Sequence, residues 1–334
     1  MKKIIAILLL PLLFLGSCST DFEINADWKD ITVVYGLLNQ NDSISYLKIN
    51  KAFLGDGNSL IMAQIEDSSS YFNNLEVNVE EWQLNPAGDP SGVPVKLLNI
   101  FSFDTTTVYE KDSGAFYYPR QIVYKSLTYQ KFNQDNLYKL QITNKITGKQ
   151  ITGQTILVNN FNLKQPGPST KYIKLKTNES HVEWITGKNG RRYEVMIRFH
   201  YKELPSTGGL DTVYKQIDWI LPSMNSAELT GGELMSLPYT PKYFYTLLQN
   251  KLPKDPSISR YVGKVDFMVS VASDEFSTFL DVVVPSSSVV QEKPDYTNMT
   301  NGIGIFSSRF QIKKSLILES TSVDTLKTLG LGFQ

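Results

Sequence analysis

Residues Ile31 to Leu38 read ITVVYGLL, and residues Ser43 to Ile49 read SISYLKI. The first run is rich in β-branched and large apolar residues. The second alternates polar and apolar residues with a period of two, as a strand with one buried face does. Between them, Asn39 to Asp42 supplies turn-forming residues. This stretch predicts a β-hairpin and indicates a mainly β fold.

The same alternation returns further along the first half of the chain. Each new run is short and is followed by a turn signal, which is typical of an antiparallel sandwich. We therefore expect an immunoglobulin-like or fibronectin-like β-sandwich over residues 27–163. Tyr138 stands at the head of a late strand, where such sandwiches often bury a tyrosine. The further strands that we predict are Leu75–Glu80, Tyr138–Thr143 and Gln150–Ile156.

A break in the pattern at Gln165 to Ser169 predicts a domain boundary, because two prolines and a glycine cannot continue a sheet ladder. Beyond it, we expect a β-rich domain over residues 169–334 with two or three short helices. Thr240 followed by Pro241 predicts the start of one helix, and Ser273 that of another. The strands that we predict here are Tyr172–Leu175, His181–Ile185, Arg192–Tyr201, Val213–Leu221 and Val262–Val271.

Composition excludes several classes of protein. The 334 residues are 41% hydrophobic and 20% charged, with 33 basic and 33 acidic side chains. Such a chain is too apolar for disorder, and its neutral balance gives no reason to expect a nucleic-acid partner. A single Cys and two His exclude a disulfide framework and a Cys/His zinc site. Phosphate-loop and dinucleotide motifs are lacking as well, so we expect no metal and no cofactor.

The N-terminus resembles a bacterial lipoprotein signal. Met1 to Lys3 is basic, and the apolar run Ile4 to Leu15 is shorter than the roughly 20 residues that span a bilayer. The following Gly16-Ser17-Cys18 completes a lipobox-like sequence. We expect residues 1–17 to be removed, Cys18 to carry diacylglycerol and palmitate, and residues 18–26 to act as a linker.

Lipidation at Cys18 would hold the folded body on a membrane, because two or more acyl chains anchor a protein where a single chain binds only marginally. The alternative is an ordinary secretory signal followed by a chance cysteine. The choice between a periplasmic and a cell-surface position stays open.

Candidate catalytic groups are few. His181 and His200 are predicted on different strands, where a histidine is more often structural than a general base. Two carboxylate pairs are visible, Glu80-Glu81 and Asp274-Glu275. The first lies on an alternating strand and the second at a predicted helix N-terminus, so each has a structural explanation. We therefore expect no enzyme activity.

Aromatic residues next to loop-forming Pro or Gly give a better indication of binding. Rings exposed on loops stack against sugars or peptide side chains. The alternative is that these rings fill the core or a seam between domains. The candidate ligand-binding residues are Tyr117, Tyr118, Tyr239, Tyr243 and Tyr245.

Two segments carry a resemblance to a family. The first is VYGLL at Val34–Leu38 with YLKINKAFLG at Tyr46–Gly55, and the second is YTNMTNGIGIFSSR at Tyr296–Arg309. Both resemble a group of Bacteroidota outer-membrane lipoproteins that carry a domain of unknown function. In the second segment, Asn301-Gly302 and Gly304 permit positive φ and close backbone approach, so a tight structural turn explains it. Such lipoproteins are often encoded beside TonB-dependent transporters, so the resemblance implies an accessory role at the outer membrane.

The sequence thus leads to an ordered set of functional hypotheses. The first is a non-catalytic binding or accessory module, lipid-anchored in the outer membrane, with a TonB-dependent transporter as partner and a glycan or peptide as ligand. The second is a surface structural or adhesin-like lipoprotein. A carboxylate-dependent hydrolase is a distant third.

Overall fold

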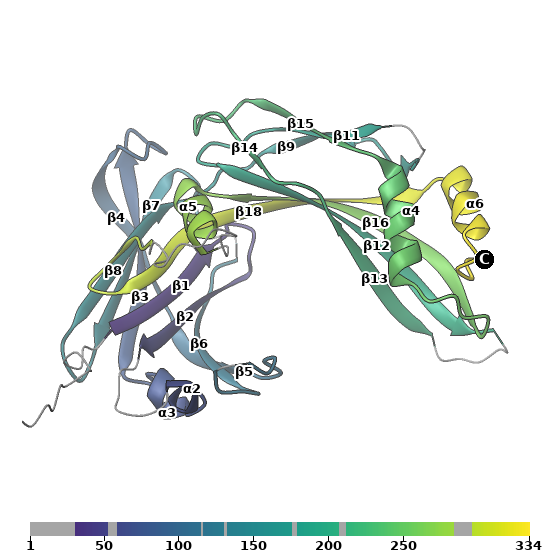
Figure 1. Cartoon of the computed structure of the whole chain (residues 1–334). Helices are drawn as coiled ribbons and strands as arrows, with labels where there is room; N and C mark the ends of the chain where they lie inside the picture. Colours follow the sequence, from purple (N-terminus) through teal and green to yellow (C-terminus); the bar gives the residue numbers. More distant parts are fainter. Residues whose placement is uncertain are drawn as a thin grey trace, which may run out of the picture.

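The computed structural model describes residues 31–52, 59–114, 116–129, 132–175, 179–206, 212–283 and 296–334. The expected signal peptide, Cys18 and the linker lie outside these residues. Within them the chain forms two lobes that long strands connect (Figure 1). The expected fold class is confirmed, because the structure is mainly β, with a sandwich in the first lobe and a β-rich second lobe that carries short helices.

The first lobe is a sandwich of two sheets. One sheet has the order β18-β1-β2-β6-β5 and the other has the order β17-β8-β7-β3-β4. Their facing side chains form a single apolar core, which contains Val34, Leu47, Leu140 and Ile151. The strands are β1 (Ile31–Leu38), β2 (Ile44–Ala52), β3 (Leu75–Asn85), β4 (Val93–Ser102), β5 (Asp104–Val108), β6 (Gln121–Leu127), β7 (Asn136–Asn144), β8 (Gln150–Ile156) and β17 (Met299–Thr300).

The second lobe is built on the other half of the larger sheet, in the order β13-β12-β16-β18, and on a small sheet in the order β15-β11-β9. Its strands are β9 (Asn162–Gln165), β10 (Tyr172–Ile173), β11 (Ser180–Ile185), β12 (Arg192–Pro205), β13 (Val213–Ile220), β14 (Met224–Asn225), β15 (Leu234–Tyr239), β16 (Ile258–Ala272) and β18 (Ile303–Leu318).

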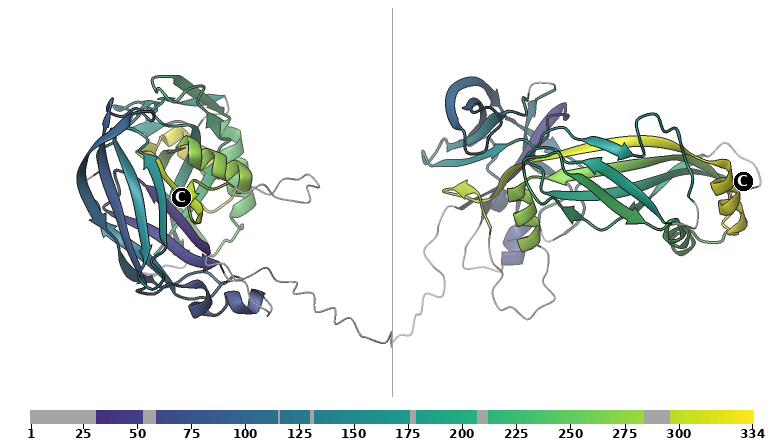
Figure 2. Two further views of the ribbon diagram at one scale, coloured as in Figure 1. Left: turned by 90° about the vertical axis from the view of Figure 1, so that its left-hand side faces the viewer. Right: turned by 90° about the horizontal axis from the view of Figure 1, so that it is seen from above.

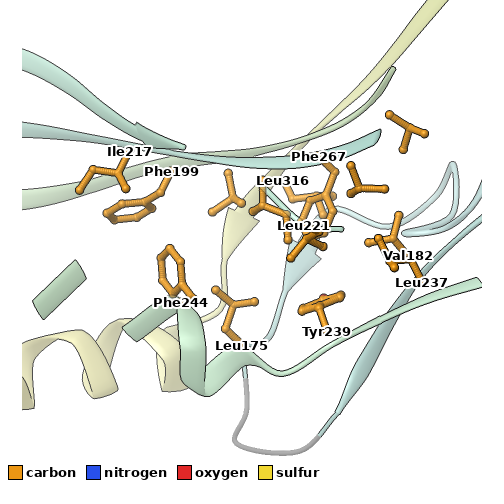
Figure 3. Close-up of a cluster of buried hydrophobic side chains, with 14 of the residues drawn as sticks. Leu175, Val182, Phe199, Ile217, Leu221, Leu237, Tyr239, Phe244, Phe267 and Leu316 are labelled. Carbon is orange, nitrogen blue, oxygen red and sulfur yellow. The ribbon is translucent and has the colours of Figure 1, made fainter. Parts of the chain in front are cut away.

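Five short helices complete the described fold: α2 (Ser59–Ala63), α3 (Glu66–Ser69), α4 (Pro241–Lys251), α5 (Asp274–Val283) and α6 (Ser320–Thr328). The helices predicted after Thr240 and Ser273 are α4 and α5. Pro241 begins α4, since its missing N–H is not needed in a first turn. Phe244 on this helix packs edge-on against Phe199 of β12, with ring centroids 5.4 Å apart, and so attaches α4 to the second-lobe core (Figure 3).

Strand β18 belongs to both lobes. It pairs in parallel with β1 and antiparallel with β16, and it runs along the length of the molecule toward α6 (Figure 2, right). Phe306 lies in the first-lobe core, whereas Phe310 and Leu316 lie in the second. The expected division into the consecutive segments 27–163 and 169–334 assigns all of β18 to the second segment, whereas this strand takes part in both lobes. The sequence pattern shows where short strands lie along the chain but not which of them pair.

The two cores meet at adjacent residues, since Leu157 belongs to the first core and Val158 to the second. Buried Ser308 of β18 links the backbone at this junction. Its hydroxyl donates to the Ile156 carbonyl at 2.9 Å and accepts from the Val158 N–H at 3.0 Å. A side-chain hydroxyl thus provides hydrogen bonds for the buried backbone groups at the point where the chain leaves the sandwich.

Tyr138 occupies the buried position expected of a sandwich tyrosine. Its side chain is fully buried, and its hydroxyl accepts a 2.7 Å hydrogen bond from the Asn133 N–H, five residues upstream. The same hydroxyl lies 3.0 Å from the buried carboxylate of Glu81. Burial and the charge of Glu81 raise the pKa of Tyr138, so the hydroxyl keeps its proton and donates.

The turn before β18 and the start of that strand have the backbone conformations that their sequence permits. Asn301 has a φ of 60° and Gly304 a φ of 110°. A Cβ on Gly304 would lie only 2.0 Å from the carbonyl oxygen of Val34, its partner on β1. Glycine is therefore required here both by φ and by the close approach of the two strands.

We predict that Gly304→Ala destabilises the protein by about 3 kcal/mol or more, because both the clash and the φ are unfavourable. Gly148→Ala is the matched control. Gly148 also has a positive φ of 71°, but a Cβ there meets nothing within 4 Å, so a loss of about 1 kcal/mol is expected. Urea denaturation followed by circular dichroism measures both. Equal losses for the two variants would show that the β1–β18 approach is not a constraint.

A buried ion pair lies in the second lobe, away from the sandwich. Arg260 is fully buried, and its Nε donates to the Glu203 carboxylate at 2.8 Å. Its Nη1 also donates to the carbonyls of Pro253 and Leu331, which attaches the C-terminal segment to β16. Burial alone would raise the pKa of Glu203, but hydrogen bonds from Lys215 and Arg260 outweigh it and hold that pKa below its usual value.

We predict that Glu203→Gln destabilises the protein by about 3–5 kcal/mol, because Arg260 is left buried without its counter-charge. In the unaltered protein the lowered pKa of Glu203 contributes stability above its unfolded pKa, and this contribution is lost as the pH falls through the folded value. The melting temperatures of the unaltered protein and the variant are therefore expected to approach each other as the pH is lowered from neutral to acidic. The same difference in melting temperature at every pH would show that the charge of Glu203 is not the source of this stability.

Candidate functional site

A cavity of about 650 Å³ opens on the first-lobe sheet that has the order β18-β1-β2-β6-β5, on the face opposite the sandwich core. Its volume lies within the range of small-molecule sites. Strands β1, β2 and β18 form one wall, and residues from α3 and the loop before β6 form the other. We call it the basic cleft. Its lining is Val33, Tyr35, Lys48, Asn50, Lys51, Glu66, Ser69, Ser70, Lys111, Phe116, Tyr117, Arg120, Gln121 and Ile303.

The sheet wall of the basic cleft follows from the alternation in β1 and β2. Val34 and Leu47 point into the core, so their neighbours point outward. Tyr35 and Lys48 are cross-strand partners, as are Val33 and Asn50. These two cross-strand pairs therefore present one apolar, one aromatic, one cationic and one amide side chain to the same cavity.

The opposite wall is held by hydrogen bonds between the loop and the helices. The Lys111 N–H donates to the Pro119 carbonyl at 2.8 Å, and the Lys111 ammonium donates to the Tyr117 carbonyl at 2.7 Å. The Tyr117 N–H in turn donates to Ala63 of α2 at 2.9 Å. The loop is thus closed on itself and attached to the helices, which positions the rings of Phe116 and Tyr117.

Electrostatics distinguish two kinds of cation in the basic cleft. Arg120 makes a 2.6 Å ion pair with Glu66, and the hydrogen bond that the guanidinium donates to that carboxylate raises the pKa of Arg120. Lys48 is different, because burial and then the positive charge of Lys111 lower its pKa. The cleft therefore holds one ammonium group, that of Lys48, that is partly desolvated and close enough to Lys111 to be repelled by it.

The tyrosines predicted to bind a ligand fall into different environments. Tyr117 lines the basic cleft, and neighbouring Tyr118 is 50% exposed outside it. Tyr243 is exposed on α4, in the second lobe. Tyr239 and Tyr245, in contrast, are buried in the second-lobe core, and Tyr239 packs there among aliphatic and aromatic side chains (Figure 3). The structure thus corrects the expectation for these last two, because their rings leave no surface for a ligand.

The two histidines lie on strands of different sheets, His181 on β11 and His200 on β12. His181 is exposed near Glu179, whereas the His200 Nε2 lies 2.9 Å from the carboxylate of Asp266 on the outer face of the second-lobe sheet. Ser315 donates to the other oxygen of Asp266 at 2.6 Å. The carboxylate thus stands between the serine and the histidine, so this network does not place the imidazole to activate the hydroxyl.

Three of the four carboxylates in the two pairs have structural partners. Glu81 is buried and accepts from Asn136 at 2.7 Å as well as from Tyr138, while Glu80 accepts from the Trp82 indole at 2.8 Å. Asp274, in the first turn of α5, pairs with Arg191 at 2.6 Å. Among the described residues, no group of three or more His, Cys, Asp or Glu side chains is placed to hold a metal ion.

The residues that sequence reasoning did not single out are the cations of the basic cleft. Lys48, Lys111 and Arg120 come from β2 and from both ends of one loop, so no local motif joins them. The alternation of β2 does place Lys48 and Asn50 outward, but only the pairing of β2 with β1 and the position of the loop show that they share a cavity.

Comparison with known proteins adds little to this geometry. No protein-family model matches the chain, and no curated protein matches it. Among solved structures, similar chains include the crystal structure of CBD12 from CALX1.2, at 9% identity and a TM-score of 0.19, with 86% of this chain and 99% of that chain covered. The calcium binding domain CBD12 of CALX1.1 is similar at 8% identity and a TM-score of 0.16, with the same coverage. At TM-scores this low, neither likeness carries an argument about function.

Within the described parts of the chain, every helix is too short or too polar to cross a bilayer.

Proposed function

We propose that this chain is a non-catalytic binding module that a lipid on Cys18 anchors in the outer membrane, where it serves as an accessory to a TonB-dependent transporter. The observation that carries the binding part of the proposal is the basic cleft, whose cavity of about 650 Å³ combines aromatic rings with cationic side chains. The anchoring and the transporter partner rest on the N-terminal sequence and on the family resemblance.

The arrangement of polar groups supports binding rather than turnover. Three of the four paired carboxylates and His200 are engaged with structural partners, and both carboxylate pairs and His200 lie outside the basic cleft. The one carboxylate among the described lining residues, Glu66, is paired with Arg120. General acid–base chemistry on a sugar uses two carboxyl groups on either side of the bond that breaks, whereas stacking and charge pairing need only the groups that line the cleft.

A surface-adhesion role is the second candidate, and strand β4 favours it. β4 is at the edge of its sheet, and its apolar side chains are unusually exposed for a strand. An exposed apolar edge strand presents backbone groups and side chains to which other chains can pair. The exposed residues are Val93, Val95, Leu97, Leu98 and Ile100, at 39–64%.

We predict that Tyr117→Ala weakens ligand binding roughly tenfold, because an aromatic contact is worth about 1–2 kcal/mol. Tyr243→Ala is the control, since Tyr243 is an exposed tyrosine in the other lobe. The probes are panels of oligosaccharides and peptides, and binding is measured by isothermal titration calorimetry. No probe is expected to be hydrolysed. Loss of binding with Tyr243→Ala but not with Tyr117→Ala would place the site elsewhere.

The membrane part of the proposal is tested on the full chain in its own membranes. Affinity purification after mild detergent extraction is expected to recover an outer-membrane β-barrel with the protein, identified by mass spectrometry. Cys18→Ala is expected to take up no palmitate analogue and to leave the membrane fraction in a carbonate wash.

Three results would contradict these expectations. A Cys18→Ala variant that still labels or stays membrane-bound overturns the lipid anchor. Recovery of the unaltered protein alone favours the adhesin-like candidate, and hydrolysis of a glycan that is lost on mutating a carboxylate pair favours the hydrolase.

A further inference from the structure

The basic cleft holds more positive than negative charge. Among the described residues, Glu66 is its one lining carboxylate, and Arg120 already pairs with it at 2.6 Å. Three ammonium groups remain, and they come from Lys48, Lys51 and Lys111. The acidic residues next to Glu66 and Lys111 in the sequence lie outside the cleft lining; they are Asp67, Glu110 and Asp112.

Lys48 is the least satisfied of these cations. Lys51 donates to the Asp67 carbonyl at 3.3 Å, and Lys111 donates to the Tyr117 carbonyl at 2.7 Å. The half-buried Lys48 ammonium, in contrast, has no hydrogen bond or ion pair with any residue that the structure describes. Burial and repulsion by Lys111 both disfavour its charged form, and an anion between the two lysines would offset these effects by favouring the charged form of each.

Aromatic side chains lie next to this charge. Tyr35, the cross-strand partner of Lys48, is 42% exposed, and Phe116 is 54% exposed. The Lys111 ammonium lies 5.8 Å from the centroid of the Phe116 ring, so a flat apolar face and a cation are close together. A ligand that fits must therefore offer an anionic group and, beside it, a ring with an apolar face.

The strands that line the basic cleft are internal members of their sheet. β1 lies between β18 and β2, and β2 lies between β1 and β6, so their backbone groups are already paired. An extended peptide that binds by adding a strand needs a free edge, which this wall does not offer. The Gln121 amide in the lining is instead suited to hydroxyl groups. The Asn50 Nδ2 already donates to the Ser69 carbonyl at 2.9 Å, and its buried Oδ1 is left as an acceptor without a partner among the described residues.

We propose that the basic cleft binds an acidic saccharide, with its anionic group between Lys48 and Lys111 and its sugar ring against Tyr35, Phe116 and Tyr117. This inference rests on the proposed binding function and names its ligand class. A carboxylate on a uronic acid and a sulfate ester on a sugar offer the same chemistry to the two lysines.

The experiment compares matched probes on the purified protein. A trimer of galacturonic acid is titrated beside its carboxyl-reduced, neutral counterpart, a sulfated trisaccharide and an acidic hexapeptide, with affinity measured by calorimetry at low and high salt. The acidic trisaccharides are expected to bind at least tenfold more tightly than the neutral one. Their affinity is expected to fall as salt rises, because the contact is electrostatic. The two acidic trisaccharides distinguish a carboxylate from a sulfate source.

Lys48→Met keeps the length and packing of the side chain but removes its charge, and it is expected to weaken acidic-saccharide binding at least tenfold while leaving the melting temperature unchanged or higher. Lys111→Met is the second variant. Lys125→Met is the control for net charge, because Lys125 is exposed on β6 of the same sheet and lies outside the cleft lining. It is expected to bind like the unaltered protein.

Each other outcome overturns a distinct statement. Equal binding of the neutral trisaccharide, unaffected by Lys48→Met and Lys111→Met, overturns the inference and leaves the binding module standing. Binding of the hexapeptide in preference to the saccharides overturns it in favour of an acidic peptide. If no acidic probe binds while another member of the panels binds in a Tyr117-dependent way, only the inference fails. If nothing binds, the proposed function fails with it.

Discussion

Val34 on β1 and Gly304 on β18 pass each other so closely that no side chain fits between them. This approach makes β18 part of the first-lobe sheet, and the rest of the architecture depends on it. From Phe306 onward the same strand continues into the second-lobe core and pairs with β16. Because one strand serves both cores, the geometry at Gly304 sets the position of one lobe relative to the other.

Local sequence patterns predicted the individual strands well, and β1, β8 and the start of α4 agree with the expected residues. Their pairing was not predictable in the same way. The first part of β18 is buried on both faces, so it lacks the alternation that marks a half-buried strand, and β4 is apolar on a face that stays exposed. The pattern around Gly304 did indicate a tight turn, but not that Val34 is the residue it approaches.

The candidate site shows the same limit more strongly. Of the five tyrosines proposed from sequence, Tyr117 lines the basic cleft, and its signal was an aromatic cluster beside a proline. Lys48 carried no such signal, because a lysine on the outer face of a strand is ordinarily solvated. The pKa of Lys48 is lowered because its ammonium is partly buried and because the loop that carries Lys111 folds over β2, which brings a second positive charge near it. Such a site is a property of tertiary structure alone.

The parallel pairing of β1 with β18 also determines the order in which the molecule can fold. During synthesis, β1 and β2 emerge early and form their hairpin from local contacts, but β1 keeps one open edge until residues 303–308 have been made. An open strand edge is prone to pair with other chains. The sandwich is therefore completed late, after most of the second lobe exists. Closing so long a loop is slow, which exposes the nascent chain to aggregation and to chaperones for much of its synthesis.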